Sequence, residues 1–132
     1  MIFEILKKEM GRENVRSYKD LLVWQKAMDI SVEVYKLTAN FPNNEIYGLT
    51  NQIRRAANSV SLNIAEGHGR RSVKSYVNFL NIAHTSLNEL ESALLLSVRL
   101  GFAIEKNMNA INLLIEEESK MLYSLISKLE SK

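Results

Sequence analysis

Apolar residues recur along most of the chain at spacings of three and four, which is the period of an amphipathic α-helix. The first such series comprises Val23, Ala27, Ile30, Val34, Leu37 and Phe41. Pro42 must end this helix, because the residue before a proline is pushed out of the helical region. Similar series follow in three further segments. The pattern predicts helices over residues 19–39, 44–66, 72–100 and 104–130.

Short connections separate the four predicted helices. Connections of this length usually join neighbouring antiparallel helices, and the near-heptad spacing favours shallow crossing angles. The sequence therefore predicts an all-α fold, an up-down-up-down antiparallel four-helix bundle over residues 17–132. Residues 1–16 lie outside the pattern, and we expect them to form an N-terminal extension that is partly ordered or a short helix.

The stretch NIAEGHGRRS, residues 63–72, joins the second and third predicted helices. It lacks the lysine and the preceding strand of a P-loop, and it lacks the third glycine of a dinucleotide fingerprint. We interpret it as a helix–turn, with Gly67 in the left-handed position after one helix, Gly69 at the reversal and Ser72 as the N-cap of the next helix. Anion contact by its two arginines is the functional alternative.

The predicted helices carry more apolar residues than the core of one bundle requires. The third has a second apolar series, and the first has additional apolar residues beside its main stripe. A chain of 132 residues cannot enclose a helix on all sides, so a second apolar face is typical of contact with another subunit. We expect a homo-oligomer; a monomer with a wide core stripe is the alternative. The candidate interface residues are Trp24, Met28, Phe79, Ile82 and Leu96.

Composition excludes several kinds of site. The chain has no cysteine, hence no disulfide and no thiolate chemistry, and a cytoplasmic location is the simple expectation. Neither His68 nor His84 has a carboxylate at the spacing of a metal site in a helical bundle, and no serine lies in a catalytic motif. We therefore expect no enzyme activity, no metal and no cofactor. We also expect no membrane contact and no signal peptide, since no segment has the required length and pattern.

Basic residues are concentrated around the second connection. The whole chain has a formal net charge of only +2, but the segment from Gln52 to Lys74 contains five basic residues and one acid, Glu66. Arginine guanidinium groups match the geometry of phosphate oxygens. We hypothesise that this region binds RNA or DNA; structural salt bridges are the alternative. The candidate nucleic-acid-binding residues are Arg54, Arg55, Arg70, Arg71 and Lys74.

Several motifs resemble a known family. The elements WQKA, YGLTNQIRRAA, NIAEGHGR and ELE occur in this order within about residues 18–103. They resemble the four-helix-bundle proteins encoded in intervening sequences of bacterial 23S ribosomal RNA genes. The resemblance implies a four-helix bundle that assembles as a homopentamer. It does not by itself specify a biochemical activity.

The chain is also similar to the accessory variability determinant of diversity-generating retroelements, a basic pentameric barrel. This similarity implies nucleic-acid binding and, by distant analogy, a reverse transcriptase as partner. Arg54, Arg55, Arg70 and Arg71 fall in the matching arginine-bearing motifs. We therefore expect a non-enzymatic oligomeric bundle that binds RNA or DNA through an arginine-rich turn region. The alternative is a protein–protein interaction scaffold without nucleic-acid binding.

Overall fold

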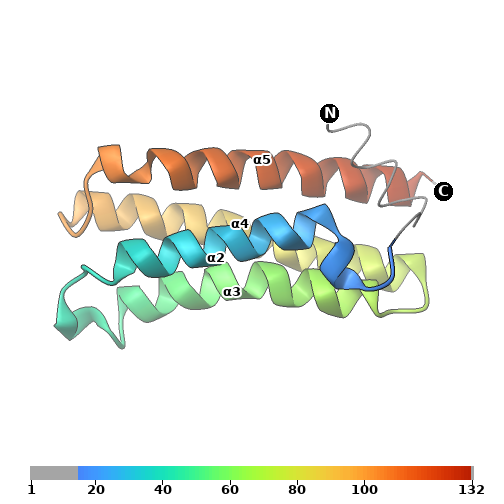
Figure 1. Cartoon of the computed structure of the whole chain (residues 1–132), viewed down its shortest axis with the longest axis horizontal. Helices are drawn as coiled ribbons and strands as arrows, with labels where there is room; N and C mark the ends of the chain where they lie inside the picture. Colours follow the sequence, from blue (N-terminus) through green and yellow to red (C-terminus); the bar gives the residue numbers. More distant parts are fainter. Residues whose placement is uncertain (1–14, 132) are drawn as a thin grey trace.

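The computed structural model describes residues 15–131, which form four long helices and two short 3₁₀ helices (Figure 1). The elements in chain order are η1 (Tyr18–Asp20), α2 (Leu22–Thr38), η2 (Asn43–Glu45), α3 (Leu49–His68), α4 (Val73–Arg99) and α5 (Glu105–Glu130). Strands are absent from residues 15–131. Of the predicted N-terminal extension, residues 1–14 lie outside the described part of the chain, and so does the stretch that we examined for a signal peptide.

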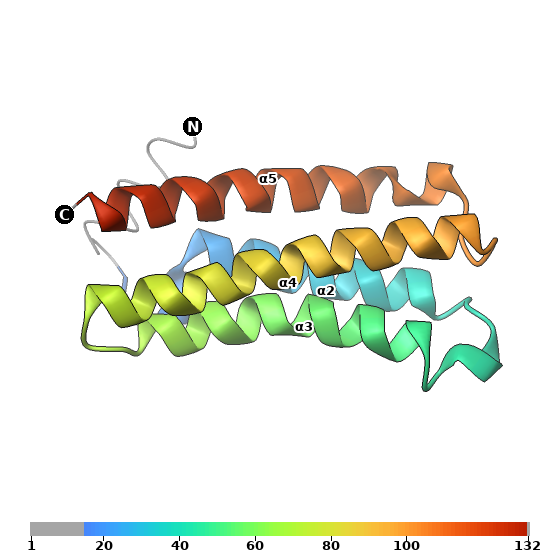
Figure 2. The same cartoon turned by 180° about the vertical axis from the view of Figure 1, so that it is seen from behind.

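Successive helices run antiparallel, and each packs against the next, while α5 returns to pack against α2 (Figures 1 and 2). Helices α2 and α4 therefore lie on one diagonal of the bundle, and α3 and α5 lie on the other. The prediction of an all-α antiparallel four-helix bundle is confirmed.

The core is built from the apolar stripes that the sequence pattern predicts. In α4, for example, Leu80, Leu87 and Leu90 are completely buried. Burial of a leucine side chain contributes about 1.5–3 kcal/mol relative to leaving it in water. One such stripe from each helix forms a single continuous core, and this core holds the surface side chains of α3 and α4 in register.

The start of α3 differs from the predicted start at residue 44. Residues Asn43–Glu45 form the separate 3₁₀ helix η2, and α3 begins only at Leu49. The backbone amide of Leu49 donates a hydrogen bond of 3.1 Å to Oε1 of Glu45. A glutamate carboxylate thus accepts a hydrogen bond from one of the free backbone amides at this helix end.

Gly67 does not occupy the left-handed position that we predicted. It lies inside α3, which continues to His68, and it is buried. A Cβ atom built on Gly67 would lie 2.7 Å from Cβ of Phe79 and 3.2 Å from the carbonyl oxygen of Tyr76. Glycine is required here because the backbones of α3 and α4 approach closely, and the interpretation as a C-terminal turn residue is wrong.

The connection between α4 and α5 does contain a left-handed glycine. Gly101 has a φ of 80° and follows the C-cap residue Leu100. The amide of Phe102 donates to the carbonyl of Ser97 at 2.9 Å, and the amide of Gly101 donates to the carbonyl of Val98 at 3.0 Å. This pair of hydrogen bonds is a Schellman motif, which satisfies carbonyl groups at the end of α4.

Candidate nucleic-acid interface

The α3–α4 turn brings three of the predicted basic residues to one end of the bundle. Gly69 is the C-cap of α3, with right-handed backbone angles, and the amide of Arg70 donates to the carbonyl of Gly67 at 3.0 Å. Ser72 is the N-cap of α4, because its Oγ accepts a hydrogen bond of 3.1 Å from the amide of Ser75. The prediction for Ser72 is confirmed, and the turn places Arg70, Arg71 and Lys74 beside the first amides of α4.

The Arg70 side chain is held against the bundle. Its Nη2 lies 2.7 Å from Oε1 of Glu66, one turn earlier on α3. Its guanidinium carbon lies 4.7 Å from the ring centroid of Phe79 on α4, in cation–π geometry. Glu66 offsets part of the positive charge, but the ion pair is half-exposed, so the guanidinium remains accessible from the solvent side.

Arg71 and Lys74 are exposed, and neither forms an ion pair with any residue in the described part of the chain. Both lie near the N-terminus of α4, where the helix dipole already contributes positive potential. A cation at this end of a helix opposes the dipole, so these two side chains do not stabilise α4. Their combined positive charge makes the turn a favourable position for an anion.

The side chain of Arg54 is held by contacts with residues of α2. Its Nε donates a hydrogen bond of 2.9 Å to Oγ1 of the buried Thr38. Its guanidinium carbon lies 4.6 Å from the ring centroid of Tyr35. The same tyrosine accepts, at its hydroxyl oxygen, a 2.9 Å hydrogen bond from Nδ2 of Asn58. Arg54 therefore joins α3 to α2 and is not presented to solvent as a free cation.

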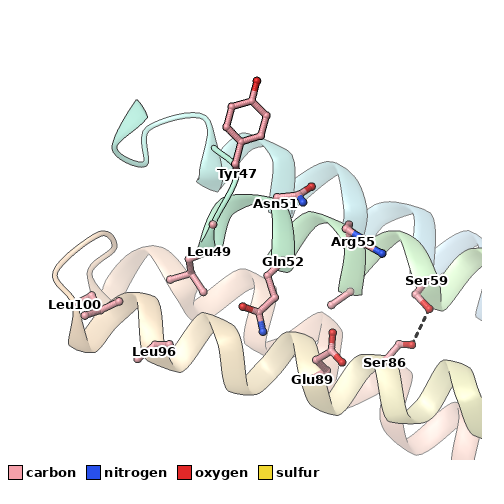
Figure 3. Close-up of a pocket in the computed structure, with 12 residues that line it drawn as sticks. Tyr47, Leu49, Asn51, Gln52, Arg55, Ser59, Ser86, Glu89, Leu96 and Leu100 are labelled. Carbon is pink, nitrogen blue, oxygen red and sulfur yellow. Dashed lines mark hydrogen bonds between the residues drawn. The ribbon is translucent and has the colours of Figure 1, made fainter. Parts of the chain in front are cut away.

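Arg55 lines a groove between α3 and α4 with a volume of about 690 Å³ (Figure 3). Glu89 of α4 lines the same groove, so the charge of Arg55 has an acidic neighbour across it. Ser59 and Ser86 share a hydrogen bond of 2.8 Å that links the two helices at one end of the groove (Figure 3). Sequence reasoning did not identify this groove, because its two walls, residues 47–59 and 86–100, lie far apart in the chain and have no common motif.

The five predicted basic residues thus form two groups. Arg55 and Gly69 are separated by 14 residues of α3 and its cap, which corresponds to roughly 21 Å along the bundle. Arg54 and Arg55 lie toward the α2–α3 end, whereas Arg70, Arg71 and Lys74 lie at the α3–α4 end. Nearness in sequence did not produce a single patch, and only the second group is a solvent-exposed cluster whose positive charges outnumber its one acid, Glu66.

The five residues predicted to lie in a subunit interface also differ in their exposure to solvent. Met28, Ile82 and Leu96 are 40%, 47% and 47% exposed. Trp24 packs partly against the core, with its ring 5.3 Å from that of Tyr18. Phe79 is half-buried beneath Arg70. Assembly through these residues stays a prediction, with the first three as its accessible members.

Two kinds of site are not found in the described residues. Within residues 15–131, no group of three or more His, Asp or Glu side chains is close enough to hold a metal ion. His84 instead pairs its Nε2 with Oγ of Ser119 on α5 at 3.1 Å. No helix in the same part of the chain combines the length and the apolar character needed to cross a membrane.

Comparisons with known proteins place this geometry in a family. No curated protein matches the chain. A solved structure from Bacteroides thetaiotaomicron, described as a protein with unknown function from the S23 ribosomal protein family, is similar in sequence and fold. The two are 30% identical, with a TM-score of 0.71 over 80% of this chain and 98% of the other. Residues 19–124 match the family model described as 23S rRNA-intervening sequence protein. The four-helix bundle and this match over most of its length show that the chain belongs to the 23S rRNA-intervening sequence protein family.

Proposed function

We propose that the protein is a non-enzymatic, oligomeric helical bundle that binds RNA or DNA through the exposed cations of the α3–α4 turn. The observation that carries the proposal is the pair Arg71 and Lys74, which are exposed and form no ion pair within residues 15–131. Arg70 adds a half-exposed guanidinium beside them. Side chains of this kind bind phosphate oxygens and carry no base specificity. A labelled RNA is the first ligand to test, although phosphate contacts alone do not distinguish RNA from DNA.

Oligomerisation would increase the effect of this small cluster. A net charge of +2 gives one subunit little long-range attraction for a polyanion. In a symmetric assembly, the turn would be repeated once per subunit, and a nucleic acid that contacts several turns would gain avidity. We propose a homopentamer, as the resemblance to the family implies. Met28 on α2 and Leu96 on α4 lie on diagonally opposite helices, which fits a head-to-tail contact of the kind that closes into a ring.

The test is fluorescence anisotropy of the purified protein with a labelled RNA hairpin over a series of salt concentrations. Binding through phosphates gives a linear fall of log K with log salt concentration, with a slope of roughly −0.7 to −0.9 per phosphate neutralised. The double variant Arg71→Ala and Lys74→Ala is expected to weaken binding and to reduce the slope by about one to two units. Absence of binding by the wild-type protein at low salt would refute the proposal.

A matched control removes the same amount of charge elsewhere. Lys19 in η1 and Lys36 in α2 are exposed and lie on or beside the helix diagonal to α4. The double variant Lys19→Ala and Lys36→Ala is expected to keep the wild-type salt slope. An equal loss in both double variants would mean that only the overall charge matters and that the turn has no special role.

The second candidate function is a protein–protein interaction scaffold. It is favoured by exposed apolar side chains on all four long helices, including Val32 on α2, Leu62 on α3, Leu95 on α4 and Leu113 on α5. If the purified protein carries a stoichiometric protein partner and no nucleic acid, this candidate replaces the first. Absorbance at 260 nm and a denaturing gel of the same preparation distinguish the two candidates.

A further inference from the structure

The end of the bundle opposite the basic turn carries a cluster of exposed apolar side chains. This end is formed by the α2–α3 and α4–α5 connections (Figures 1 and 2). Tyr47 is 94% exposed, Ile104 59%, Leu100 53% and Ile46 44%. Tyr47 points away from the helices, at the edge of the groove that Leu100 also lines (Figure 3). We call these four residues the apolar end.

The two connections that form the apolar end are fixed to each other and to the helices. The ring of Phe41 in the first connection lies 5.9 Å from the ring of Phe102 in the second, and Phe41 is buried. The Schellman motif at Gly101 and the hydrogen bond from the amide of Leu49 to Glu45 hold the neighbouring backbone. The apolar end is therefore a preformed surface, and a partner that binds it need not order a loop.

Charge is nearly absent from these two connections. The α2–α3 connection, residues 39–48, has one charged residue, Glu45, and the α4–α5 connection, residues 100–104, has none. The α3–α4 turn at the other end has two arginines within residues 69–72. The two ends of the bundle therefore differ in character, one basic and one apolar. Contiguous exposed apolar side chains mark a surface that contacts another molecule.

The charged residues beside the apolar end are balanced in sign. Two acids and two bases lie within two residues of its members in the sequence, and all four remain without an ion pair inside residues 15–131: Glu45, Arg99, Glu105 and Lys106. An apolar centre with a polar rim is the usual anatomy of a protein–protein interface. A rim of zero net charge gives no preference for a polyanion, but it can pair its acids with the bases of an identical rim.

We propose that the apolar end docks onto the apolar end of a second copy, so that two rings of subunits stack end to end. A two-fold contact brings the same surface of both copies together. The basic turns at the opposite end cannot pair in this way, because like charges in contact oppose association. Stacking therefore stops at two rings, with the basic turns on both outer faces. The inference rests on the oligomeric assembly that is part of the proposed function.

The end-to-end contact depends on the ring, because one subunit contributes few residues to it. The four apolar side chains and their rim are fewer than the roughly 20–30 residues that each partner contributes to a standard interface. In a ring, one such contact forms per subunit, and the contacts strengthen one another because they form together. Isolated subunits are therefore expected to remain monomeric, whereas rings are expected to pair.

The experiment compares the wild-type protein with the double variant Tyr47→Glu and Ile104→Glu by multi-angle light scattering. Both positions are exposed, so the chain should fold, and circular dichroism checks that it does. The wild-type protein is expected to have twice the mass of the variant, because the new carboxylates would face their equivalents across the contact. The matched control Tyr123→Glu and Leu113→Glu changes a tyrosine and an aliphatic side chain that are exposed on α5. It is expected to keep the wild-type mass.

Particle length separates end-to-end stacking from any other arrangement of the same mass. Helix α4 has 27 residues, so one layer is about 40 Å long and two layers are about 80 Å at 1.5 Å per residue. Electron microscopy is expected to show this longer particle for the wild-type protein and the shorter one for the variant. Equal masses, an equal loss in the control, or a doubled mass without the doubled length would overturn the inference and leave the single ring standing. A monomeric wild-type protein would instead defeat the proposed assembly itself.

Discussion

Gly67 of α3 lies so close to Phe79 of α4 that a Cβ atom on the glycine would be 2.7 Å from Cβ of the phenylalanine. This contact sets the separation of the two helices next to the basic turn. It also fixes the ring over which the guanidinium of Arg70 lies. Packing between two helices thereby positions a residue of the candidate interface.

The variant Gly67→Ala is therefore expected to destabilise the protein. The backbone at Gly67 is helical, so alanine suits the conformation, but its methyl group would overlap Phe79 and the carbonyl of Tyr76. Overpacking of this kind costs about 1–3 kcal/mol, measurable by urea denaturation. Gly69→Ala is the control, because the nearest atom to its added Cβ is 3.6 Å away and its φ is −77°. A Gly67→Ala protein as stable as the Gly69→Ala protein would contradict the packing argument.

Gly101 is needed for its backbone conformation and not for packing. Substituting it therefore measures the cost of the left-handed conformation alone. Nothing lies within 4 Å of a Cβ atom built there, but φ is 80°. Gly101→Ala is expected to lower the free energy of unfolding by about 1–2 kcal/mol, because L-residues are strained in the left-handed region. Gly101→Asn is expected to lose less, since asparagine tolerates that region better than alanine. Thermal unfolding monitored by circular dichroism would rank the three proteins; equal stabilities would contradict the Schellman assignment.

Arg54 and Arg55 are adjacent in sequence but are expected to respond differently to removal. Arg54→Ala loses the hydrogen bond to Thr38 and the cation–π contact with Tyr35. The expected cost is about 1–2 kcal/mol of stability. Arg55→Ala removes an exposed side chain and is expected to change stability by less than about 0.5 kcal/mol. Urea denaturation of both variants is the measurement, and an Arg54→Ala protein that loses no more stability than Arg55→Ala would mean that the assigned contacts of Arg54 do not stabilise the fold.

The proposed assembly depends on exposed apolar side chains of α2 and α4. The variant Leu96→Glu places a charge at a 47% exposed position, so the isolated subunit should tolerate it. If Leu96 is in a subunit interface, the mass by multi-angle light scattering is expected to fall to that of the 15.1 kDa chain. Leu113→Glu on α5 is the control, at a position that is also exposed. A wild-type protein that is already monomeric would rule out the assembly.

The amino-acid sequence by itself determined the helices and several of their ends. Burial of one face imposes a spacing of three and four on apolar residues, so the stripes can be recognised without knowledge of their partners. The cap at Ser72 was also recognisable, because a cap acts on backbone groups only a few residues away. The family motifs lie within these same helices and in the connections beside α3.

The tertiary structure alone decided which side chains are available to a partner. A glycine is needed at position 67 because Phe79 of another helix lies so close to it. The contacts that hold Arg54 come from Tyr35 and Thr38 on α2. No local period encodes such contacts, because they join positions that become neighbours only when the helices pack. For the same reason, a cluster of basic residues in the sequence became two separate groups.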